Sequence, residues 1–368
     1  MRQLLWNNWE NTQSWDELKK LQKTTLKHSG DAIRAASTII GKDPYNFDLQ
    51  KGREIVSAFV YELGVSSGLA LLTGGRIGLH SIVHFGSQEL RNKYVENVLN
   101  GEHFISLAIS EPTVGTDIIN VKTSAILQDD MYIINGVKKW ISGGLFADTF
   151  VVFAKTQKGY GLFVVDAKTP GVMVYPQEYQ GAHSSGGSKI IFTNVKVGTE
   201  NVITSTDGLL MTADILLEER WMTGLSALVT ARTAFDASIA GTKNRIVHKK
   251  PLWSKQLVRS RLANMYTGIQ YMDAWSVRIT DQIQAYRNKD PSALSFQLLS
   301  AEVALFKSAS TEHARNTVEN ASHLGGGRAY EVGNPIEKLH RVVNGLNYAG
   351  GTCDPLKDMA MNVILSKL

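Results

Sequence analysis

The sequence predicts a multidomain α+β protein, because its hydrophobic pattern changes period twice along the 368 residues. Up to about residue 105, apolar residues recur every three or four positions, as in amphipathic helices. Short β-branched and aromatic runs then dominate, and from about residue 208 the helical period returns. We expect an N-terminal helical domain over 1–105, a central antiparallel β-barrel or sandwich over 106–207, and a C-terminal four-helix-bundle domain over 208–368.

The N-terminal part contains two segments with a clear helical pattern. They are DLQKGREIVSAFVYELG at 48–64 and HFGSQELRNKYVENVLNG at 84–101. The second ends on Asn100-Gly101, and an Asn-Gly pair is a helix-stop signal. Between them, SSGLALLTGGRIGLHSIV at 66–83 is apolar and rich in small residues, which predicts a buried helix.

The central part reads as strands divided by turn signals such as Asn135-Gly136 and Pro170-Gly171. The predicted strand segments are MYIINGVKKWISGG, DTFVVFAKT, YGLFVVDAK, GVMVYPQ and KIIFTNVKV. Three long helical segments follow, at 227–243, 257–287 and 293–327, and they are long enough to form a bundle.

The charge pattern gives little evidence of function. The net charge of +5 is spread out, apart from KNRIVHKK at 243–250. We interpret it as a solvated surface, and the alternative is attraction to an anionic ligand such as a nucleotide or a phosphopantetheine carrier. We find no motif typical of nucleic-acid binding, and we expect no nucleic-acid partner.

The cysteine count and the hydropathy predict a cytoplasmic protein. Cys353 is the single cysteine, which rules out an internal disulfide framework and fits a reducing compartment. We expect it to be a small packing residue. The first residues lack the unbroken apolar core of a signal peptide, and no apolar run is long enough to cross a bilayer, so we expect no membrane insertion.

Two adjacent carboxylates, Glu218 and Glu219, raise a question that helix chemistry alone does not answer. They lie in LLEERWMTG at 216–224, early in a predicted long helix, and neither has a Lys or Arg three or four places away. One interpretation of Glu219 is a solvated residue in the first helical turn, favoured by the helix dipole. The other, a catalytic role, depends on the motifs described next.

Three motifs in order carry a family resemblance. ISLAISEPTVGTD at 105–117 is followed by YIINGVKKWISGG at 132–144. The third is HLGGG at 323–327, followed by NPIEKLHRVV at 334–343 and AGGT at 349–352. Together with the α-β-α order, they strongly resemble the acyl-CoA dehydrogenase family, from about residue 50 to the C-terminus.

The resemblance implies FAD as the cofactor. A flavin needs hydrogen-bond donors at N1 and O2, where negative charge gathers on reduction, and Ser110 with the loop backbone after it supplies them. Gly115 and Thr116 let the loop approach the ring, Trp140 offers an apolar face, and Ser142 places a hydroxyl near N5. By resemblance, the flavin is expected at Ser110, Thr116, Trp140 and Ser142.

The resemblance places the adenine half of FAD partly against the next subunit, so we expect a homo-oligomer, either a dimer or a tetramer. Arg245 falls on the family's Arg, but His248 and Lys249 replace the usual Phe-Gly. An Arg can still pair with pyrophosphate through its planar fork. The family's paired glycines correspond to Gly325 and Gly326, whereas Ser322 replaces the usual Gln, and Thr352 completes the expected FAD contacts.

The usual catalytic base of the family is missing. Most members have a Glu just before a Gly-Thr near the end of the chain, and that position is Gly350. A minority, including isovaleryl-CoA dehydrogenase, carries the Glu on an upstream helix directly before an Arg, and Glu219-Arg220 matches that pair. We expect Glu219 to be the base, with Arg220 and Gly350 beside the substrate. Asp354 is a weaker alternative, since Asp before Pro is commonly a turn residue.

The expected activity is FAD-dependent α,β-dehydrogenation of an acyl thioester, carried either by coenzyme A or by an acyl carrier protein. The sequence does not indicate the electron acceptor or the acyl chain. Two alternatives use the same fold, namely a flavin oxidase or oxygenase and a catalytically degenerate flavin-binding member. His80 and His84 have the i, i+4 spacing of metal ligands, but no third ligand is evident, so we predict a satisfied helix face and no metal.

Overall fold

The computed structural model describes residues 48–63 and 77–367, and these form two compact units. The first, called the sheet unit below, comprises 77–179 and 183–219. The second, the helical unit, comprises 48–63, 180–182 and 220–367. The α+β multidomain class is confirmed, while the three-domain division at 105 and 207 stays a prediction. The apolar segment 66–76 lies outside the described residues.

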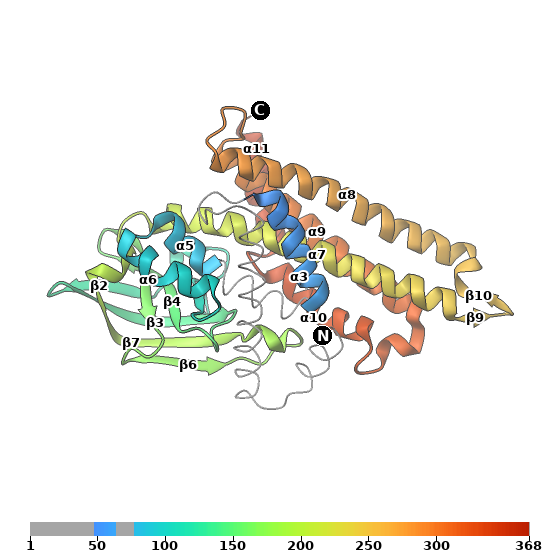
Figure 1. Cartoon of the computed structure of the whole chain (residues 1–368), viewed down its shortest axis with the longest axis horizontal. Helices are drawn as coiled ribbons and strands as arrows, with labels where there is room; N and C mark the ends of the chain where they lie inside the picture. The colour runs from blue at the N-terminus through green and yellow to red at the C-terminus, as the bar shows by residue number, and fades with distance from the viewer. Residues whose placement is uncertain (1–47, 64–76, 368) are drawn as a thin grey trace. The chain divides into compact units, whose positions relative to one another are not determined.

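The sheet unit is built on one eight-stranded sheet (Figure 1). Its hydrogen-bonded order is β6-β7-β3-β2-β4-β5-β8, and β1 pairs in parallel with β4. Among the described strands this order does not close, so the barrel alternative is wrong for this part of the chain. The strands are β1 (Ile105–Ala108), β2 (Ser124–Gln128), β3 (Met131–Ile141), β4 (Thr149–Thr156), β5 (Gly159–Asp166), β6 (Val172–Pro176), β7 (Ser188–Gly198) and β8 (Val202–Thr204).

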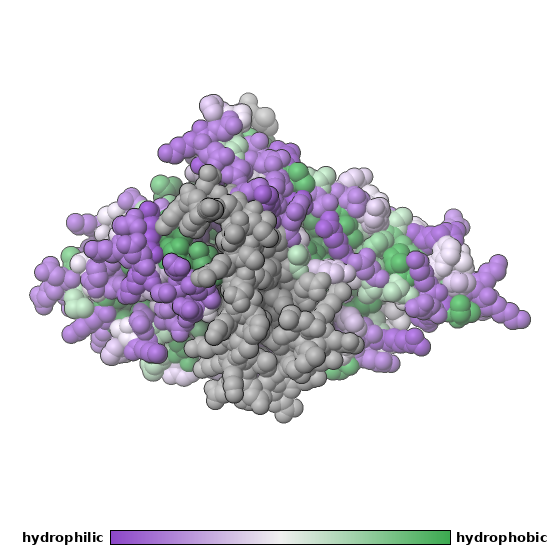
Figure 2. Space-filling view, viewed as in Figure 1, coloured by the Kyte–Doolittle hydropathy of each residue, from purple (hydrophilic) through white to green (hydrophobic). Residues whose placement is uncertain are grey.

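Apolar side chains from neighbouring strands form the core of the sheet unit. Phe150 and Phe163 are fully buried, and Phe192 packs edge-on against Phe150. Helices α5 (Gly78–Phe85) and α6 (Gln88–Leu99) pack against each other, and α5 also contacts β1 and β4 (Figure 1). On the face shown in Figure 2, hydrophilic residues predominate over the strands, as expected when the β-branched and aromatic side chains point inward.

The predicted helix stop at Asn100-Gly101 is confirmed. Helix α6 starts after Ser87, whose hydroxyl accepts a hydrogen bond from the Leu90 backbone N–H at 3.2 Å. It ends at Leu99, Asn100 is the C-cap, and Gly101 takes the left-handed conformation at φ 70°.

The prediction of a turn at Asn135-Gly136 is wrong. Both residues lie inside β3, where the register against β7 shifts between Ile134 and Gly136. Gly136 has φ 154°, and a Cβ at this position would lie 2.4 Å from the Thr123 hydroxyl oxygen. Glycine is therefore required here by a β-bulge and a close approach, not by a hairpin turn.

The helical unit contains a bundle in which α9 is central, because α9 contacts α8, α10 and α11. Helix α7 begins in the sheet unit and continues into the helical unit from Arg220. None of the described helices has the length and apolarity needed to cross a membrane. The helices are α3 (Leu49–Leu63), α7 (Gly208–Asn244), α8 (Gln256–Arg287), α9 (Phe296–Gly325), α10 (Pro335–Tyr348) and α11 (Cys353–Leu365).

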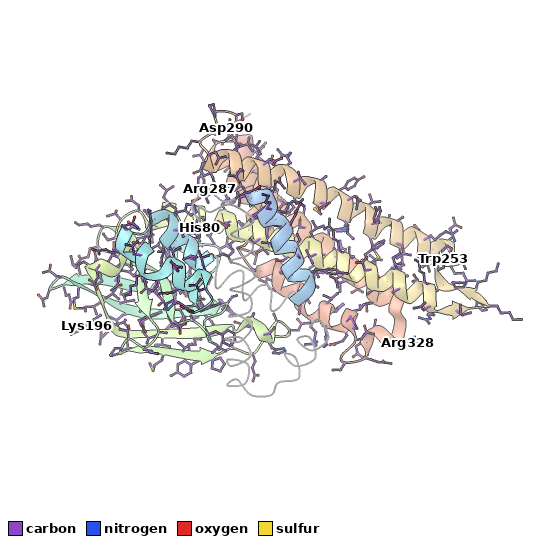
Figure 3. The ribbon with its side chains drawn as sticks, viewed as in Figure 1. His80, Lys196, Trp253, Arg287, Asp290 and Arg328 are labelled. Carbon is purple, nitrogen blue, oxygen red and sulfur yellow. The ribbon has the colours of Figure 1, made fainter. Side chains whose placement is uncertain are left out.

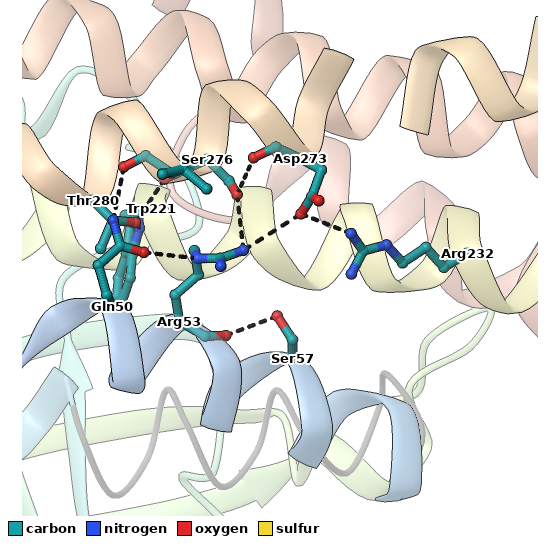
Figure 4. Close-up of polar contacts among 9 residues, drawn as sticks. Gln50, Arg53, Ser57, Trp221, Arg232, Asp273, Ser276 and Thr280 are labelled. Carbon is teal, nitrogen blue, oxygen red and sulfur yellow. Dashed lines mark hydrogen bonds and ion pairs between the residues drawn. The ribbon is translucent and has the colours of Figure 1, made fainter. Parts of the chain in front are cut away.

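Polar contacts join three of these helices (Figure 4). The Trp221 indole N–H of α7 donates to the Thr280 hydroxyl of α8 at 2.9 Å, and both residues are buried. The Asp273 carboxylate of α8 forms ion pairs with Arg232 of α7 at 2.7 Å and with Arg53 of α3 at 3.4 Å. These contacts hold α3 and α7 on the same helix, α8.

Two glycines of α7 differ in their surroundings and provide a matched stability test. A Cβ on Gly224 would lie 2.5 Å from the buried Phe306 ring, whereas a Cβ on Gly241 would meet no atom within 4 Å. We expect Gly224→Ala to lower the free energy of unfolding by about 1–3 kcal/mol through overpacking. Gly241→Ala should raise it by about 0.5–1 kcal/mol, because alanine is the better helix former. Urea denaturation of both variants checks this, and stabilisation by Gly224→Ala would contradict the described packing of α7 on α9.

Candidate active site

The loop that follows β1 is held in place by backbone hydrogen bonds. Glu111 and Val114 exchange backbone bonds at 2.8 and 3.1 Å, which closes a tight turn. The Ser110 carbonyl accepts from the Lys139 backbone N–H of β3 at 2.9 Å. Ser110 is therefore fixed beside the end of β3 that carries Trp140.

A buried ion pair lies beneath this loop. The Lys138 ammonium of β3 donates to Glu111 Oε1 at 2.9 Å and to the Ile109 carbonyl at 2.7 Å. Glu111 also accepts from the Thr123 hydroxyl at 2.6 Å and from the backbone N–H groups of Thr123 and Lys122 at 2.9 and 2.7 Å. Glu111 is 2% exposed and Lys138 is fully buried, so both charges depend on these partners.

Both groups of this pair remain charged at neutral pH, although the pKa of each is shifted from its ordinary value. Burial lowers the pKa of Lys138 to about 8, while Glu111 opposes the fall. Burial alone would raise the pKa of Glu111, but Lys138, Thr123 and the Lys122 backbone N–H outweigh it, so the net pKa of Glu111 is lowered.

Trp140 has an unusual backbone conformation and an accessible ring. Its φ is 61°, it lies next to a register shift between Lys139 and Ile141, and it is 48% exposed. A bulky residue at positive φ is strained and persists where the surrounding structure fixes it. The Lys139 ammonium lies 5.0 Å from the ring centroid. The adjacent Ser142 carbonyl accepts from the buried Ser106 hydroxyl of β1 at 2.5 Å, which ties the end of β3 to β1.

The four residues expected at the flavin are accessible enough to contact a bound flavin. Thr116 and Trp140 are exposed, Ser110 and Ser142 are half-buried, and a Cβ on Gly115 would meet nothing within 4 Å. An accessible indole beside hydroxyls and open backbone suits a planar ring with polar edges.

Glu218 has a partner that lies far away in the sequence. His80 lies on α5 (Figure 3). Its Nδ1 lies 2.5 Å from Glu218 Oε2 and its Nε2 3.8 Å from Asp214 Oδ2, and all three residues are buried. The His84 ring lies tilted by 42° against the His80 ring, with 4.2 Å between the ring centroids. No group of His, Cys, Asp or Glu residues in the described part of the chain has an arrangement that would hold a metal ion.

Glu219 lies well inside α7, because this helix begins at Gly208. It is half-buried, so a solvated position in the first helical turn does not describe it. Its neighbour Arg220 is 9% exposed and donates from Nε to the Gly350 carbonyl at 3.0 Å. The structure thus brings together Arg220 and Gly350, the two residues expected at the substrate.

The loop around Gly350 is held by two buried cations. The fully buried Lys307 ammonium of α9 donates to the carbonyls of Asn347 at 3.0 Å and Gly351 at 2.7 Å, and Arg220 holds Gly350 between them. Gly350 and Gly351 have φ values of 66° and 108°, a conformation that favours glycine. This loop contributes backbone carbonyls to the two cations and has no carboxylate at position 350.

Arg245 and the glycine pair also lie together, within the helical unit. Arg245 Nη1 lies 3.4 Å from the Gly325 carbonyl, and a Cβ on Gly326 would lie 3.1 Å from the same nitrogen. Gly325 is the last residue of α9, and Gly326 has φ 61°. An exposed guanidinium beside backbone without side chains suits a pyrophosphate.

Residues 246–251 form a two-stranded hairpin, β9 (Ile246–Val247) with β10 (Lys250–Pro251). His248 and Lys249 form its two-residue turn with φ values of 51° and 62°, a conformation usually taken by Asn or Gly. Thr352 is the N-cap residue of α11 and makes no side-chain cap bond. Cys353 Sγ lies 3.3 Å from the Thr311 hydroxyl, and Asp354 is exposed in the first turn of α11.

The sequence interpretation missed the buried polar partners of the site. Lys138 and Lys307 lie in runs that read as ordinary strand and helix. For His80, the i, i+4 spacing with His84 was a signal, and Asp214 and Glu218 have the same spacing on another helix. The link between the two pairs required the tertiary structure.

Comparison with known proteins identifies the family. Residues 106–195 match the model of the acyl-CoA dehydrogenase middle domain, and residues 206–365 match that of the acyl-CoA dehydrogenase C-terminal domain. Together the matches cover more than half of the chain. The chain therefore belongs to the acyl-CoA dehydrogenase family, whose members use FAD.

Two curated relatives illustrate the similarity. The chain is 28% identical over 290 residues to cyclohex-1-ene-1-carbonyl-CoA dehydrogenase of Geobacter metallireducens, covering 76% of this chain and 74% of that protein. It is 29% identical over 212 residues to mitochondrial isovaleryl-CoA dehydrogenase of Oryza sativa subsp. japonica, covering 56% of this chain and 52% of that protein.

Two solved structures share the fold. Glutaryl-CoA dehydrogenase of Mycobacterium smegmatis in complex with FADH2 superposes with a TM-score of 0.85 at 19% identity, covering 100% of this chain and 94% of that one. The prolyl acyl carrier protein oxidase AnaB superposes with a TM-score of 0.83 at 19% identity, covering 100% and 97%. At these identities the likeness supports the fold.

The Glu111–Lys138 pair gives a pH-dependent prediction. Lys138→Met leaves a buried carboxylate without its cation, so the free energy of unfolding at neutral pH should fall by about 3–5 kcal/mol. The lowered folded-state pKa of wild-type Glu111 stabilises the protein above the unfolded value of 4.5, and this contribution is lost as pH falls through the folded value. The variant lacks that contribution, so its deficit should shrink on acidification. Denaturant titrations at several pH values measure both effects.

Lys139→Met is the matched control, because Lys139 is the next residue of β3 and is only half-buried. Its effect should stay within about 0.5 kcal/mol at every pH, as is usual for surface changes. Equal, pH-independent losses in both variants would contradict a role for the buried pair.

Proposed function

We propose that this protein is an FAD-dependent dehydrogenase that introduces an α,β double bond into an acyl thioester, with Glu219 as the base that removes the α-proton. The observation that carries the proposal is the pairing of Arg220 with Gly350. This contact joins the helix of Glu219 to the loop in which most of the family has its carboxylate and this chain has glycine.

The chain's own residues supply the cofactor contacts. Ser110 and Thr116 offer hydroxyls to the polar edge of the flavin, Trp140 offers an apolar face, and Ser142 lies at the end of β3 next to it. FAD held by these residues would supply a two-electron acceptor for the hydride that leaves the β-carbon of the acyl group. Support for this arrangement comes from the accessibility of these residues and from the strained, exposed conformation of Trp140.

Removal of the α-proton requires a carboxylate in hydrogen-bond reach and a polarised thioester carbonyl. In the sequence, the positions three and four places from Glu219 hold uncharged residues, namely Ile215, Leu216, Met222 and Thr223. Arg220 projects about 100° away around the helix, on the side of the Gly350 loop. Two relatives are named cyclohex-1-ene-1-carbonyl-CoA dehydrogenase and isovaleryl-CoA dehydrogenase, and these names support the same reaction class.

We also propose a homo-oligomer, a dimer or a tetramer, in which Arg245, Gly325 and Gly326 serve the FAD of a neighbouring copy. The substrate is an acyl group on coenzyme A or on an acyl carrier protein, and the prolyl acyl carrier protein oxidase with the same fold makes the second source worth testing. A cytoplasmic location fits the single cysteine.

Substitution of the base gives the most direct activity prediction. Glu219→Gln keeps the size of the side chain but removes the base, so kcat should fall by about 10²–10⁴-fold while FAD stays bound. Anaerobic mixing with CoA-bound and carrier-bound acyl groups, followed through bleaching of the oxidised flavin band, measures the step directly. Asp354→Asn, a change at the exposed alternative, should bleach at the wild-type rate.

Wild-type bleaching by Glu219→Gln would overturn the base assignment, and absence of bleaching by any thioester in the wild type would overturn the dehydrogenase proposal. Rapid oxygen consumption without an added acceptor would instead indicate an oxidase. A colourless protein whose melting temperature FAD does not raise would indicate a degenerate member of the family.

The oligomer proposal predicts an effect of Arg245 on cofactor affinity. Arg245→Ala removes the guanidinium expected at the pyrophosphate, so the Kd for FAD should rise about tenfold or more. Flavin fluorescence on dilution measures this, and Arg259→Ala, a change at another exposed arginine, is the control. A strictly monomeric protein by light scattering that still binds FAD tightly would contradict a cofactor shared between subunits.

A further inference from the structure

A buried histidine bridges two acidic residues of α7 directly before Glu219. His80, Glu218 and Asp214 are 5, 6 and 8% exposed. His80 Nδ1 lies 2.5 Å from Glu218 Oε2, and its Nε2 lies 3.8 Å from Asp214 Oδ2. Asp214 and Glu218 are four residues apart, so they lie one above the other on the same face of α7. One imidazole therefore contacts two successive turns of this helix.

The helix that carries His80 is packed tightly on the sheet. A Cβ on Gly78 would lie 2.6 Å from the Ile105 carbonyl oxygen and 2.8 Å from Ile105 Cγ2, so α5 and β1 are in direct backbone contact. Strand β1 ends at Ala108 and leads into the loop that begins at Ser110. His80 and the loop expected to bind the flavin are thus fixed to the same strand.

The beginning of α7 is also fixed to the sheet, at a second place. A Cβ on Gly208 would lie 2.7 Å from the Tyr160 carbonyl oxygen of β5. Gly208 sets where the helix starts, and the contacts of Asp214 and Glu218 with His80 set how it is rotated about its axis. Successive residues differ in direction by about 100°, so fixing Glu218 fixes the direction in which Glu219 leaves the helix.

We propose that His80 is a positioning residue for Glu219. By holding Glu218 and Asp214, it fixes the rotation of α7 relative to β1 and therefore the direction of Glu219 relative to the loop that starts at Ser110. This inference rests on the proposed role of Glu219 as the base. It also explains why Glu218 is buried, although Glu219 is the residue assigned to the chemistry.

The physical reason for holding the helix by a polar contact is the length scale of catalysis. A base must be held within a few tenths of an ångström of its productive position, and loss of such support lowers the rate without removing the catalytic group. Each ring nitrogen of His80 faces a carboxylate oxygen, and both carboxylates lie on the same face of α7, so rotation of the helix about its axis would move both away from the ring.

The test compares His80→Leu with His103→Leu in the FAD-loaded protein. His103 is a half-buried histidine of the same unit, and it hydrogen-bonds the Thr149 hydroxyl of β4 at 2.8 Å. We expect His80→Leu to lower kcat about 10–100-fold while KM and the Kd for FAD change less than twofold. The kinetic isotope effect with an α-deuterated thioester should increase, because proton abstraction becomes slower. His103→Leu should leave all of these values unchanged.

Two further measurements keep the test decisive. Amide hydrogen exchange over residues 212–222 should become at least tenfold faster in His80→Leu, a readout that does not depend on turnover. The double variant with Glu218→Gln and His80→Leu should have a kcat no lower than that of His80→Leu alone, because both substitutions remove the same contact between His80 and Glu218. If His80→Leu does not fold, His80→Asn replaces it in the test, because Asn keeps a neutral hydrogen-bond donor in the site. His80→Asn should lower kcat by less than the loss expected for His80→Leu and should leave KM unchanged.

Wild-type kcat and isotope effect in His80→Leu, beside an inactive Glu219→Gln, would overturn this inference and leave the base assignment intact. Full activity of Glu219→Gln would overturn the base assignment itself and this inference with it. A loss of kcat in His103→Leu as large as in His80→Leu would show a general effect of instability and would also overturn the positioning role.

Discussion

The site depends on the buried ion pair between Glu111 and Lys138. Glu111 belongs to the loop after β1, Lys138 belongs to β3, and neither charge is stable in the interior without the other. Their contact sets the distance between the loop that begins at Ser110 and the strand end that carries Trp140 and Ser142. Gly136 contributes from the same strand, because its missing side chain lets Thr123 come close enough to hydrogen-bond Glu111. The flavin contacts proposed for this unit are therefore arranged around one pair of opposite charges.

Buried polar and charged side chains also fix backbone elsewhere in each of the two units. Arg220 and Lys307 hold a loop of glycines through its carbonyl groups, and His80 holds two carboxylates of α7. In each case a buried polar side chain contacts backbone or helix at a defined place, which apolar packing alone would leave free to shift. Burying such groups costs stability unless every contact is made, and this makes them suitable for positioning a base rather than for holding the fold together.

Much of the fold followed from the sequence, because strand and helix periods are local signals. The five predicted strand segments correspond to β3–β7, and the end of α6 was readable from Asn100-Gly101. Asn135-Gly136 was misread because the same dipeptide serves hairpin turns and bulges, and only the close approach of Thr123 distinguishes them. The His80–Glu218 contact was not predictable, since it joins two helices far apart in the sequence. Gly350 was recognisable as a missing carboxylate only through the family resemblance, whereas its contact with Arg220 required the structure.

We infer that Glu219 of α7 is the catalytic base, since the loop at Gly350 has no carboxylate at that position. A crystal structure of the FAD-loaded protein with an unreactive thioester analogue tests it most directly. We expect a Glu219 carboxylate oxygen within about 3–3.5 Å of the analogue's α-carbon, the range of a near-attack geometry. A Glu219 side chain directed into bulk solvent, with another acid or none beside the α-carbon, would contradict it.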